Sequence, residues 1–182
     1  MLILLLIAGL LGGLTIGQAQ PPVKVGDLVL RTDFEKPEDR ERWSKSAYAQ
    51  WVEVPGRGHC LQVTVPPEQG AGGNMIQLPV DLSSYRGCRL VCECLAKAEG
   101  VTRPPQSYLG VKFMLHYVSP TTGASWTNQN DVYGTFDWKK LSFVASIAPD
   151  ATGGQISLGL QESSGTVWFD DIRITVYKGP RP

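Results

Sequence analysis

The sequence has no excess of charge of either sign. Its 182 residues include 17 Lys and Arg against 17 Asp and Glu, so the formal net charge is zero. Proteins that bind nucleic acid or an anionic membrane surface rely on a basic field to attract these partners. Because the chain as a whole has no such field, we expect neither a nucleic-acid partner nor a membrane-surface partner.

Residues that commonly carry catalysis or bind zinc are scarce. There are two histidines, His59 and His116, and neither lies in a nucleophile motif such as G-x-S-x-G. There is no C-x-x-C pair, and neither histidine stands at ligand spacing from a cysteine. Glycoside hydrolysis needs two carboxylates facing one cleft, and Glu93 is the one strong candidate on an outward strand face. The sequence therefore predicts a protein that is not an enzyme.

One long apolar run is present, from Met1 to Gln20, and it is broken by glycines. A membrane-spanning helix needs roughly 20 predominantly apolar residues, and the glycines at 9, 12, 13 and 17 make this run a poor one. The small residues Gly17 and Ala19 suit the third and first positions before a cleavage site, although the initiator amine is the one positive charge. We expect a signal peptide over residues 1–19 and a secreted protein, extracellular or periplasmic, with a retained anchor as the alternative.

The four cysteines leave two interpretations open. Cys92 and Cys94 stand two residues apart, so on a strand they share one face about 6.5 to 7 Å apart, at the edge of bridging range. They could be small buried thiols of a core strand. In an oxidising compartment a disulfide between Cys60 and Cys88 is the alternative.

The rest of the chain shows the pattern of an all-β protein. With 20 Gly and 13 Pro, turn residues recur between short segments that alternate apolar and polar residues. The one helical candidate is residues 36–43, where Pro37 suits a first turn. We expect one domain over residues 23–178, a two-sheet antiparallel β-sandwich, followed by a tail at 179–182. The predicted strands are residues 28–33, 50–55, 60–65, 75–82, 88–98, 109–118, 125–128, 138–147, 155–161 and 166–177.

Acidic residues near both ends of this domain need a neutralising partner. Residues 32–35 read T-D-F-E, and residues 167–172 read V-W-F-D-D-I. Adjacent carboxylates near a core strand repel one another, and a hard cation with oxygen ligands would neutralise them. The alternative is that the two late aspartates alternate faces, one solvated and the other paired with Arg31 or Arg173.

These segments resemble a known family in their order and spacing. The motifs are D-F-E followed by Trp43, then G-V-K-F-M-L-H-Y, Y-G-T-F-D-W-K-K-L-S-F and L-G-L-Q-E-S-S-G-T-V-W-F-D-D-I-R-I-T-V. Over residues 29–176 they are similar to carbohydrate-binding modules of families four and nine, galactose-binding-like jelly rolls attached to glycoside hydrolases. The resemblance implies a non-catalytic jelly-roll sandwich, which we expect to be a monomer.

The resemblance also implies a structural calcium that joins the first strand to the last. Its oxygen ligands would come from Glu35 and from Asp170 or Asp171, with Asp33 and backbone carbonyls of residues 55–58 as further ligands. Asp170 is favoured because it precedes a strand whose core residues are in phase with it.

Sugar recognition needs aromatic faces for stacking and planar polar side chains for hydroxyl groups. In modules of this group a shallow cleft on the concave sheet holds a β-linked polysaccharide or oligosaccharide. Tyr48 and Trp51 form an alternative site at one end of the sandwich. For the cleft, the outward strand positions and a rim segment supply Gln77, Glu93, Lys112, His116 and Gln161, with Trp126, Asn128 and Gln129 at the rim.

Two other functions remain open at this stage. The same sandwich could serve as a cell-surface adhesion domain that contacts a protein partner through its loop tips. It could also be a β-sandwich glycoside hydrolase or lyase, in which case Glu93 would be the catalytic candidate.

Overall fold

Ten strands dominate residues 22–180, the part of the chain that the structure, a computed structural model, describes. The predicted signal peptide lies outside the described residues. Every predicted strand is confirmed, with boundaries that differ by a few residues. In chain order the elements are β1 (Leu28–Thr32), α1 (Pro37–Glu41), β2 (Ala49–Val54), β3 (Gly58–Val65), a 3-10 turn (Pro67–Gln69), β4 (Gly73–Val80), a 3-10 turn (Ser83–Tyr85), β5 (Arg89–Val101), β6 (Gly110–Ser119), β7 (Gly123–Asn128), β8 (Gly134–Ser146), β9 (Thr152–Gln161) and β10 (Gly165–Lys178).

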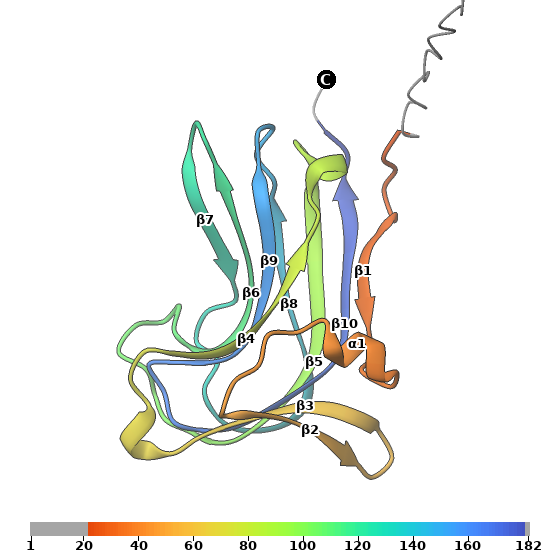
Figure 1. Cartoon of the computed structure of the whole chain (residues 1–182). Helices are drawn as coiled ribbons and strands as arrows, with labels where there is room; N and C mark the ends of the chain where they lie inside the picture. Colours follow the sequence, from red (N-terminus) through yellow and green to blue (C-terminus); the bar gives the residue numbers. More distant parts are fainter. Residues whose placement is uncertain (1–21, 181–182) are drawn as a thin grey trace, which may run out of the picture.

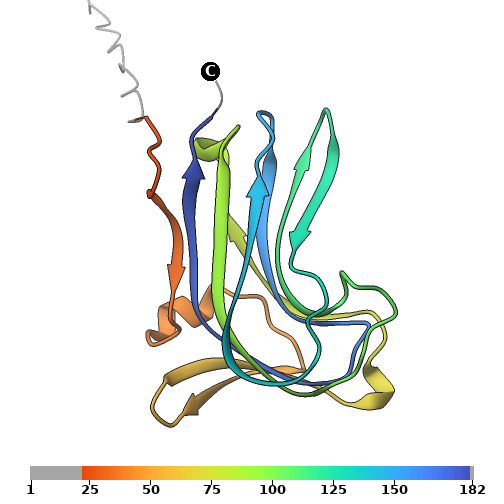
Figure 2. The same cartoon turned by 180° about the vertical axis from the view of Figure 1, so that it is seen from behind.

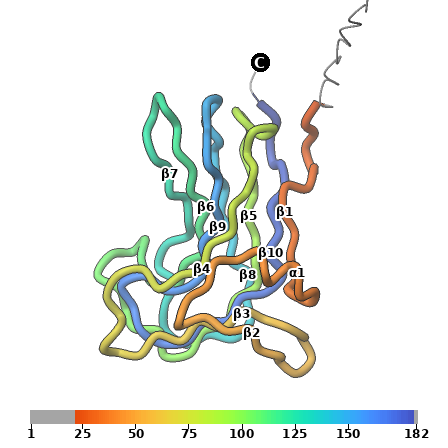
Figure 3. Tube along the Cα trace, in the orientation of Figure 1, coloured from red at the N-terminus to blue at the C-terminus, as the bar shows by residue number. Residues whose placement is uncertain are grey.

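The strands form two antiparallel sheets that pack face to face (Figures 1 and 2). The six-stranded sheet has the order β2-β3-β10-β5-β8, and β1 also pairs with β10. The four-stranded sheet has the order β4-β9-β6-β7. The two ends of the described chain lie at the same end of the sandwich (Figure 3). The predicted two-sheet sandwich is confirmed.

The core lies between the sheets and follows the predicted period of two. On β6 the residues Val111, Phe113 and Leu115 are buried, and the inward positions of β4, β5 and β9 are buried as expected. The rings of Phe113 and Phe143 meet edge to face across the two sheets, with centroids 5.1 Å apart. Each such side chain contributes about 1.5 to 3 kcal/mol on burial.

A β-bulge interrupts β10 at its two aspartates. The pairing with β5 skips from Asp170 opposite Leu95 to Arg173 opposite Glu93, and Asp171 has a φ of 50°. The extra residue shifts the phase of the strand, so the apolar residues on both sides of the bulge face the core. The bulge also leaves Asp170 buried, as expected from the sequence.

The predicted helix forms as the single-turn α1, with Pro37 in its first turn. Aromatic side chains from the segments before and after it pack together. The Phe34 ring lies 6.0 Å from that of Trp43 and 5.0 Å from that of Trp51, measured between centroids. Among residues 22–180, no helix has the length and apolar content needed to cross a membrane.

All four cysteines are free and buried, which confirms the interpretation as core thiols. The alternative disulfide between Cys60 and Cys88 does not form. Burial, reinforced by the nearby Asp170 carboxylate, raises the pKa of the Cys60 thiol to about 12. A thiol in this environment is a poor nucleophile.

Candidate functional site

The outer face of the four-stranded sheet carries a hollow, the cleft, of about 550 Å³. All four strands contribute to it, together with the loop before β6. Because successive strand residues point to opposite faces, the outward residues of neighbouring strands gather here while their neighbours fill the core. The cleft is lined by Met75, Gln77, Tyr108, Lys112, Met114, His116, Trp126, Asn128, Gln155, Ser157 and Gln161.

Strand register arranges these side chains in rows across the sheet. In one row His116 of β6 stands opposite Trp126 of β7 and Gln155 of β9. In the next row, two residues along β6, Met114 stands between Asn128 and Ser157. The face therefore offers the exposed Trp126 ring at its edge and a floor of amide, hydroxyl and thioether groups.

Trp126 is the most exposed aromatic ring of the cleft, with 62% of its surface accessible. Its indole stacks on the His116 imidazole, with centroids 5.1 Å apart and an interplanar angle of 28°. The imidazole therefore supports one face of the indole, and the rest of the ring stays accessible. Such a platform suits the apolar C–H face of a pyranose.

Hydrogen bonds fix the hairpin that carries Trp126. The turn between β6 and β7 ends at Gly123, whose φ of 85° favours glycine. Asp150 accepts hydrogen bonds from the Ser119 hydroxyl at 2.7 Å, the Thr121 hydroxyl at 2.8 Å and the Thr121 amide at 3.0 Å. These hydrogen bonds hold the pKa of the Asp150 carboxyl below its usual range. The tryptophan thus sits on an anchored hairpin.

Lys112 lies at the floor of the cleft and is 2% exposed. Its ammonium donates a hydrogen bond to the backbone carbonyl of Tyr108 and lies 5.8 Å from the centre of the Tyr108 ring. The same carbonyl accepts a hydrogen bond from the Asn128 side chain at 3.1 Å. Burial lowers the pKa of Lys112 to about 8.

A glycine beside this lysine lets strands β9 and β4 approach closely. Gly159 of β9 stands between Lys112 on one side and Met75 on the other. Its φ is 149°, and a Cβ on it would lie 2.2 Å from the Asn74 carbonyl oxygen. No side chain fits at this position without moving the β4 backbone.

We expect Gly159→Ala to lower the free energy of unfolding by about 1 to 3 kcal/mol, the usual cost of overpacking. The measurement is urea denaturation followed by tryptophan fluorescence. Gly179→Ala is the control, because a Cβ at Gly179 meets no atom within 4 Å. Equal stability of the two variants would show that the β4 backbone shifts to accommodate the added methyl group without a cost in free energy.

Six of the seven side chains predicted to bind carbohydrate line the cleft. They are Gln77, Lys112, His116, Trp126, Asn128 and Gln161. Gln129, predicted at the rim, instead donates a hydrogen bond from its side chain to the Val111 carbonyl at 3.3 Å. It lies in the loop that follows β7 and does not line the cleft.

Glu93 requires a correction. It lies on β5 in the six-stranded sheet, away from the cleft, and accepts a hydrogen bond from Lys140 at 2.9 Å. Its outward phase is the same as that of the cleft residues, but periodicity identifies the face of a strand and not the sheet to which the strand belongs. Sequence reasoning also missed Tyr108, because loop residues have no periodicity.

The residues predicted to hold calcium lie near the bulge of β10. There Arg57, from the loop between β2 and β3, places Nη1 3.1 Å from Asp170 Oδ2 and 3.6 Å from Asp171 Oδ2. The guanidinium also lies 4.4 Å above the Trp138 ring. Burial raises the pKa of the Asp170 carboxyl, and the hydrogen bond from Arg57 opposes that shift. The arginine partner of this carboxylate is therefore Arg57 and neither Arg31 nor Arg173.

The early carboxylates have partners of their own. Glu35 accepts a hydrogen bond from the His59 amide at 2.9 Å, and its other oxygen lies 3.2 Å from His59 Nδ1. Asp33 accepts one from the Glu35 amide at 3.3 Å. Within residues 22–180, no three Asp, Glu, His or Cys side chains gather as metal ligands, whereas Ca²⁺ takes six to eight oxygens. As arranged here, the residues fit an arginine–carboxylate cluster better than a calcium site, and calcium stays a prediction.

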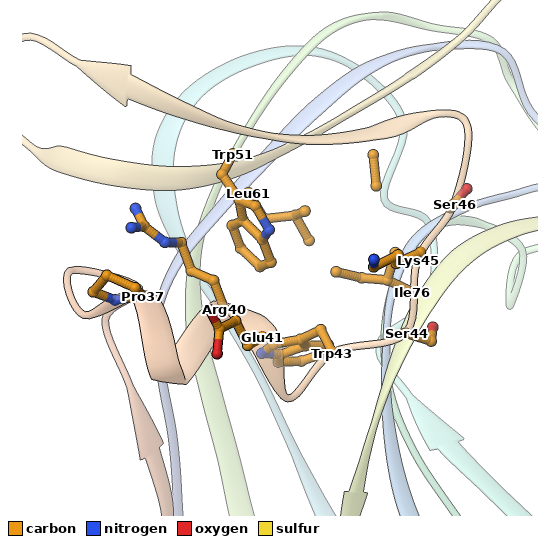
Figure 4. A pocket seen from close by; sticks show the side chains of 11 residues that line it. Pro37, Arg40, Glu41, Trp43, Ser44, Lys45, Ser46, Trp51, Leu61 and Ile76 are labelled. Atoms are coloured by element: carbon orange, nitrogen blue, oxygen red, sulfur yellow. The ribbon is translucent and has the colours of Figure 1, made fainter.

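A second hollow, of about 480 Å³, opens at the end of the sandwich beside α1 (Figure 4). Trp43 and Trp51 line it, together with Arg40 and Glu41 of α1 and the segment that follows. Tyr48 does not line it, and its hydroxyl instead bonds the Gln69 side chain at 3.2 Å. The structure thus places only the tryptophan of the predicted alternative pair at this hollow.

Comparison with known proteins identifies the fold and goes no further. No protein-family model matches the chain, and no curated protein matches it. Among solved structures it is similar to the family 22 xylan-binding domain CBM22-1 of Xyn10C from Paenibacillus barcinonensis, with a TM-score of 0.62 and 16% identity over 86% of this chain and 99% of that one.

Two further structures agree with this result. The C-terminal family 22 module of Xyn10B from Clostridium thermocellum matches with a TM-score of 0.60 and 15% identity, over 89% of this chain and all of that one (100%). A family 16 carbohydrate-binding module matches with a TM-score of 0.56 and 13% identity, over 81% and 99% of the two chains. The chain therefore has the jelly-roll fold of carbohydrate-binding modules, while the narrower resemblance to families four and nine stays a prediction.

Proposed function

We propose that this protein binds a β-linked polysaccharide or oligosaccharide in the cleft on the four-stranded sheet. The observation that carries the proposal is the exposed Trp126 ring, which stacks on His116 at the edge of a hollow lined by amide and hydroxyl groups. Binding of xylan by the similar family 22 domain supports a glycan of this class. Affinity would be modest, because desolvation of the polar groups offsets part of the free energy gained from stacking and hydrogen bonding.

The proposal is for binding without catalysis. Hydrolysis of a glycosidic bond needs two carboxyl groups on either side of the scissile bond. The cleft lining includes no Asp or Glu, and Glu93 lies on the other sheet. We therefore favour a binding module over the hydrolase or lyase alternative. Secretion is part of the same proposal, because polysaccharides of this class occur outside the cell. A monomeric state is also part of it.

Affinity electrophoresis tests the proposal most directly. The protein is run through native gels that contain soluble β-glucan, xylan or mannan, beside a gel without polysaccharide. We expect retardation in at least one of the three polymers and no release of reducing sugar from any of them. Unchanged mobility in all three would contradict glycan binding and favour the protein-interaction alternative, whereas release of sugar would favour an enzyme.

A further inference from the structure

The charge balance of the cleft differs from that of the chain. Acidic and basic residues are equal in the sequence, at 17 each. Among the cleft residues, Lys112 is the one Lys or Arg, and there is no Asp or Glu. His116, on the same strand and the same face, is the second group that can carry positive charge, and Tyr108 is the other titratable group there. The lining of the cleft that carries the exposed Trp126 ring therefore has no acidic side chain.

Lys112 has no carboxylate partner on any strand that surrounds it. The outward neighbours on β9 and β4 are Gly159 and Met75, and β7 contributes Asn128 and Trp126. The ion pairs among residues 22–180 do not include Lys112. One protein acceptor, the Tyr108 carbonyl, serves an ammonium group that has three N–H donors.

Such a lysine is costly for the protein. Taking an ammonium out of water costs several kcal/mol unless an opposite charge and hydrogen bonds compensate. A methionine would fill the same space without that cost, and Met75 and Met114 already lie beside it. The uncompensated charge therefore points to a counter-ion that comes from outside the chain.

We propose that the cleft selects a glycan with negatively charged substituents, and that Lys112 pairs with the anionic group of that ligand. This inference rests on the proposed function and specifies the class of glycan. Tyr108, in the loop before β6, covers the ammonium, so its loop must shift to let the ligand anion take the place of its carbonyl. On polysaccharides the anion is a uronate carboxylate or a sulfate ester, and the experiment separates the two.

The test compares a polymer with its own neutral form. Isothermal titration measures the affinity of the wild-type protein for glucuronoxylan and for the same glucuronoxylan after chemical reduction of its carboxyl groups. We expect the acidic form to bind about tenfold or more tightly, a difference of about 1.4 kcal/mol. A sulfated galactan and its desulfated form make the second arm, and a preference in either arm supports the inference.

Two variants place the preference on Lys112. Lys112→Met should lose the preference for the acidic polymer over its neutral form. Lys97→Met, which removes the same charge from the outer face of the six-stranded sheet, should keep the preference. The preference should also fall as the pH rises above about 8, where Lys112 loses its charge.

The outcomes separate this inference from the proposed function. Equal affinity for the acidic and neutral forms in both arms overturns the acidic preference and leaves glycan binding in place. A preference that survives in Lys112→Met overturns the role of this lysine. No binding to any glycan, neutral or acidic, overturns both proposals. The comparison of polymers uses the wild-type protein, so it holds even if Lys112→Met fails to fold.

Discussion

Replacing Arg57 with alanine is expected to lower the free energy of unfolding by about 1 to 3 kcal/mol. The change leaves the Asp170 carboxylate buried without its cation, since the side chain of Asp170 is 4% exposed. Arg57 itself is 25% exposed, so water screens part of the interaction and the expected loss stays below that of a fully buried pair. Packing of the guanidinium on Trp138 is lost as well.

The pH dependence of the stability loss in Arg57→Ala tests whether the buried Asp170 carboxylate causes that loss. Without Arg57, the pKa of Asp170 should rise further above its unfolded value, because only the hydrogen bond from the Asp171 amide would then oppose the effect of burial. A carboxyl group whose folded pKa is raised destabilises the fold at neutral pH, and this cost disappears as the group becomes protonated. Urea denaturation should therefore show a smaller deficit for Arg57→Ala at about pH 5 than at about pH 7.5. A deficit independent of pH would contradict this account.

The matched control is Arg31→Ala. Arg31 is an exposed arginine on β1 that makes no ion pair among residues 22–180. Its loss should change stability by no more than about 0.5 kcal/mol. If Arg31→Ala loses as much stability as Arg57→Ala, the loss comes from removing any positive charge and not from removing the contact with Asp170.

The same variant tests the calcium that the family resemblance implies. Calcium would compete with the Arg57 guanidinium for Asp170, so it should stabilise Arg57→Ala more than the wild type. A ligand at 100 times its dissociation constant adds about 2.7 kcal/mol to the folded state. Thermal melting with calcium chloride and then with a chelator measures the effect. No change in the melting temperature of either protein would rule calcium out as a structural ligand.

Trp126→Ala is expected to weaken binding of the polysaccharide that retards the wild-type protein about thirtyfold, the equivalent of about 2 kcal/mol, as for an aromatic hot-spot residue. The indole supplies the stacking surface, and no other cleft ring rests on His116. Because the indole is largely exposed, its removal should leave the melting temperature nearly unchanged.

Trp51→Ala is the comparison for this experiment. Trp51 lines the other hollow, at the end of the sandwich, and should be dispensable for binding. Affinity electrophoresis of both variants in the same gel gives the answer. Retardation lost in Trp51→Ala and kept in Trp126→Ala would move the site to the second hollow.

Local alternation was enough to predict most of the fold. The segment with Ile156, Leu158 and Leu160 predicts a strand with one buried face, and the structure buries all three residues. The sheet to which a strand belongs depends on pairing between distant segments, which alternation does not encode. For this reason β5 and β6 looked alike in the sequence, and Glu93 was grouped with residues of the other sheet.

Two contacts that sequence reasoning missed come from residues in loops. Arg57 and Tyr108 both lie in connections between strands, and each acts on a residue far away or on another element. The equal count of charges in the sequence gave no sign that one face has a cation without an anion. Such a local imbalance exists only after folding has separated the charges.

The position of β10 has a consequence for how the protein folds during synthesis. This strand is the last of the ten described strands, yet β1, β3 and β5 all pair with it. Until it leaves the ribosome, β1 has no partner strand, and β3 lacks its link to β5. The six-stranded sheet therefore assembles only after nearly the whole domain has been translated, and early strands with unpaired edges must wait in the meantime. A chaperone that binds nascent chains would therefore be needed most before β10 has been synthesised.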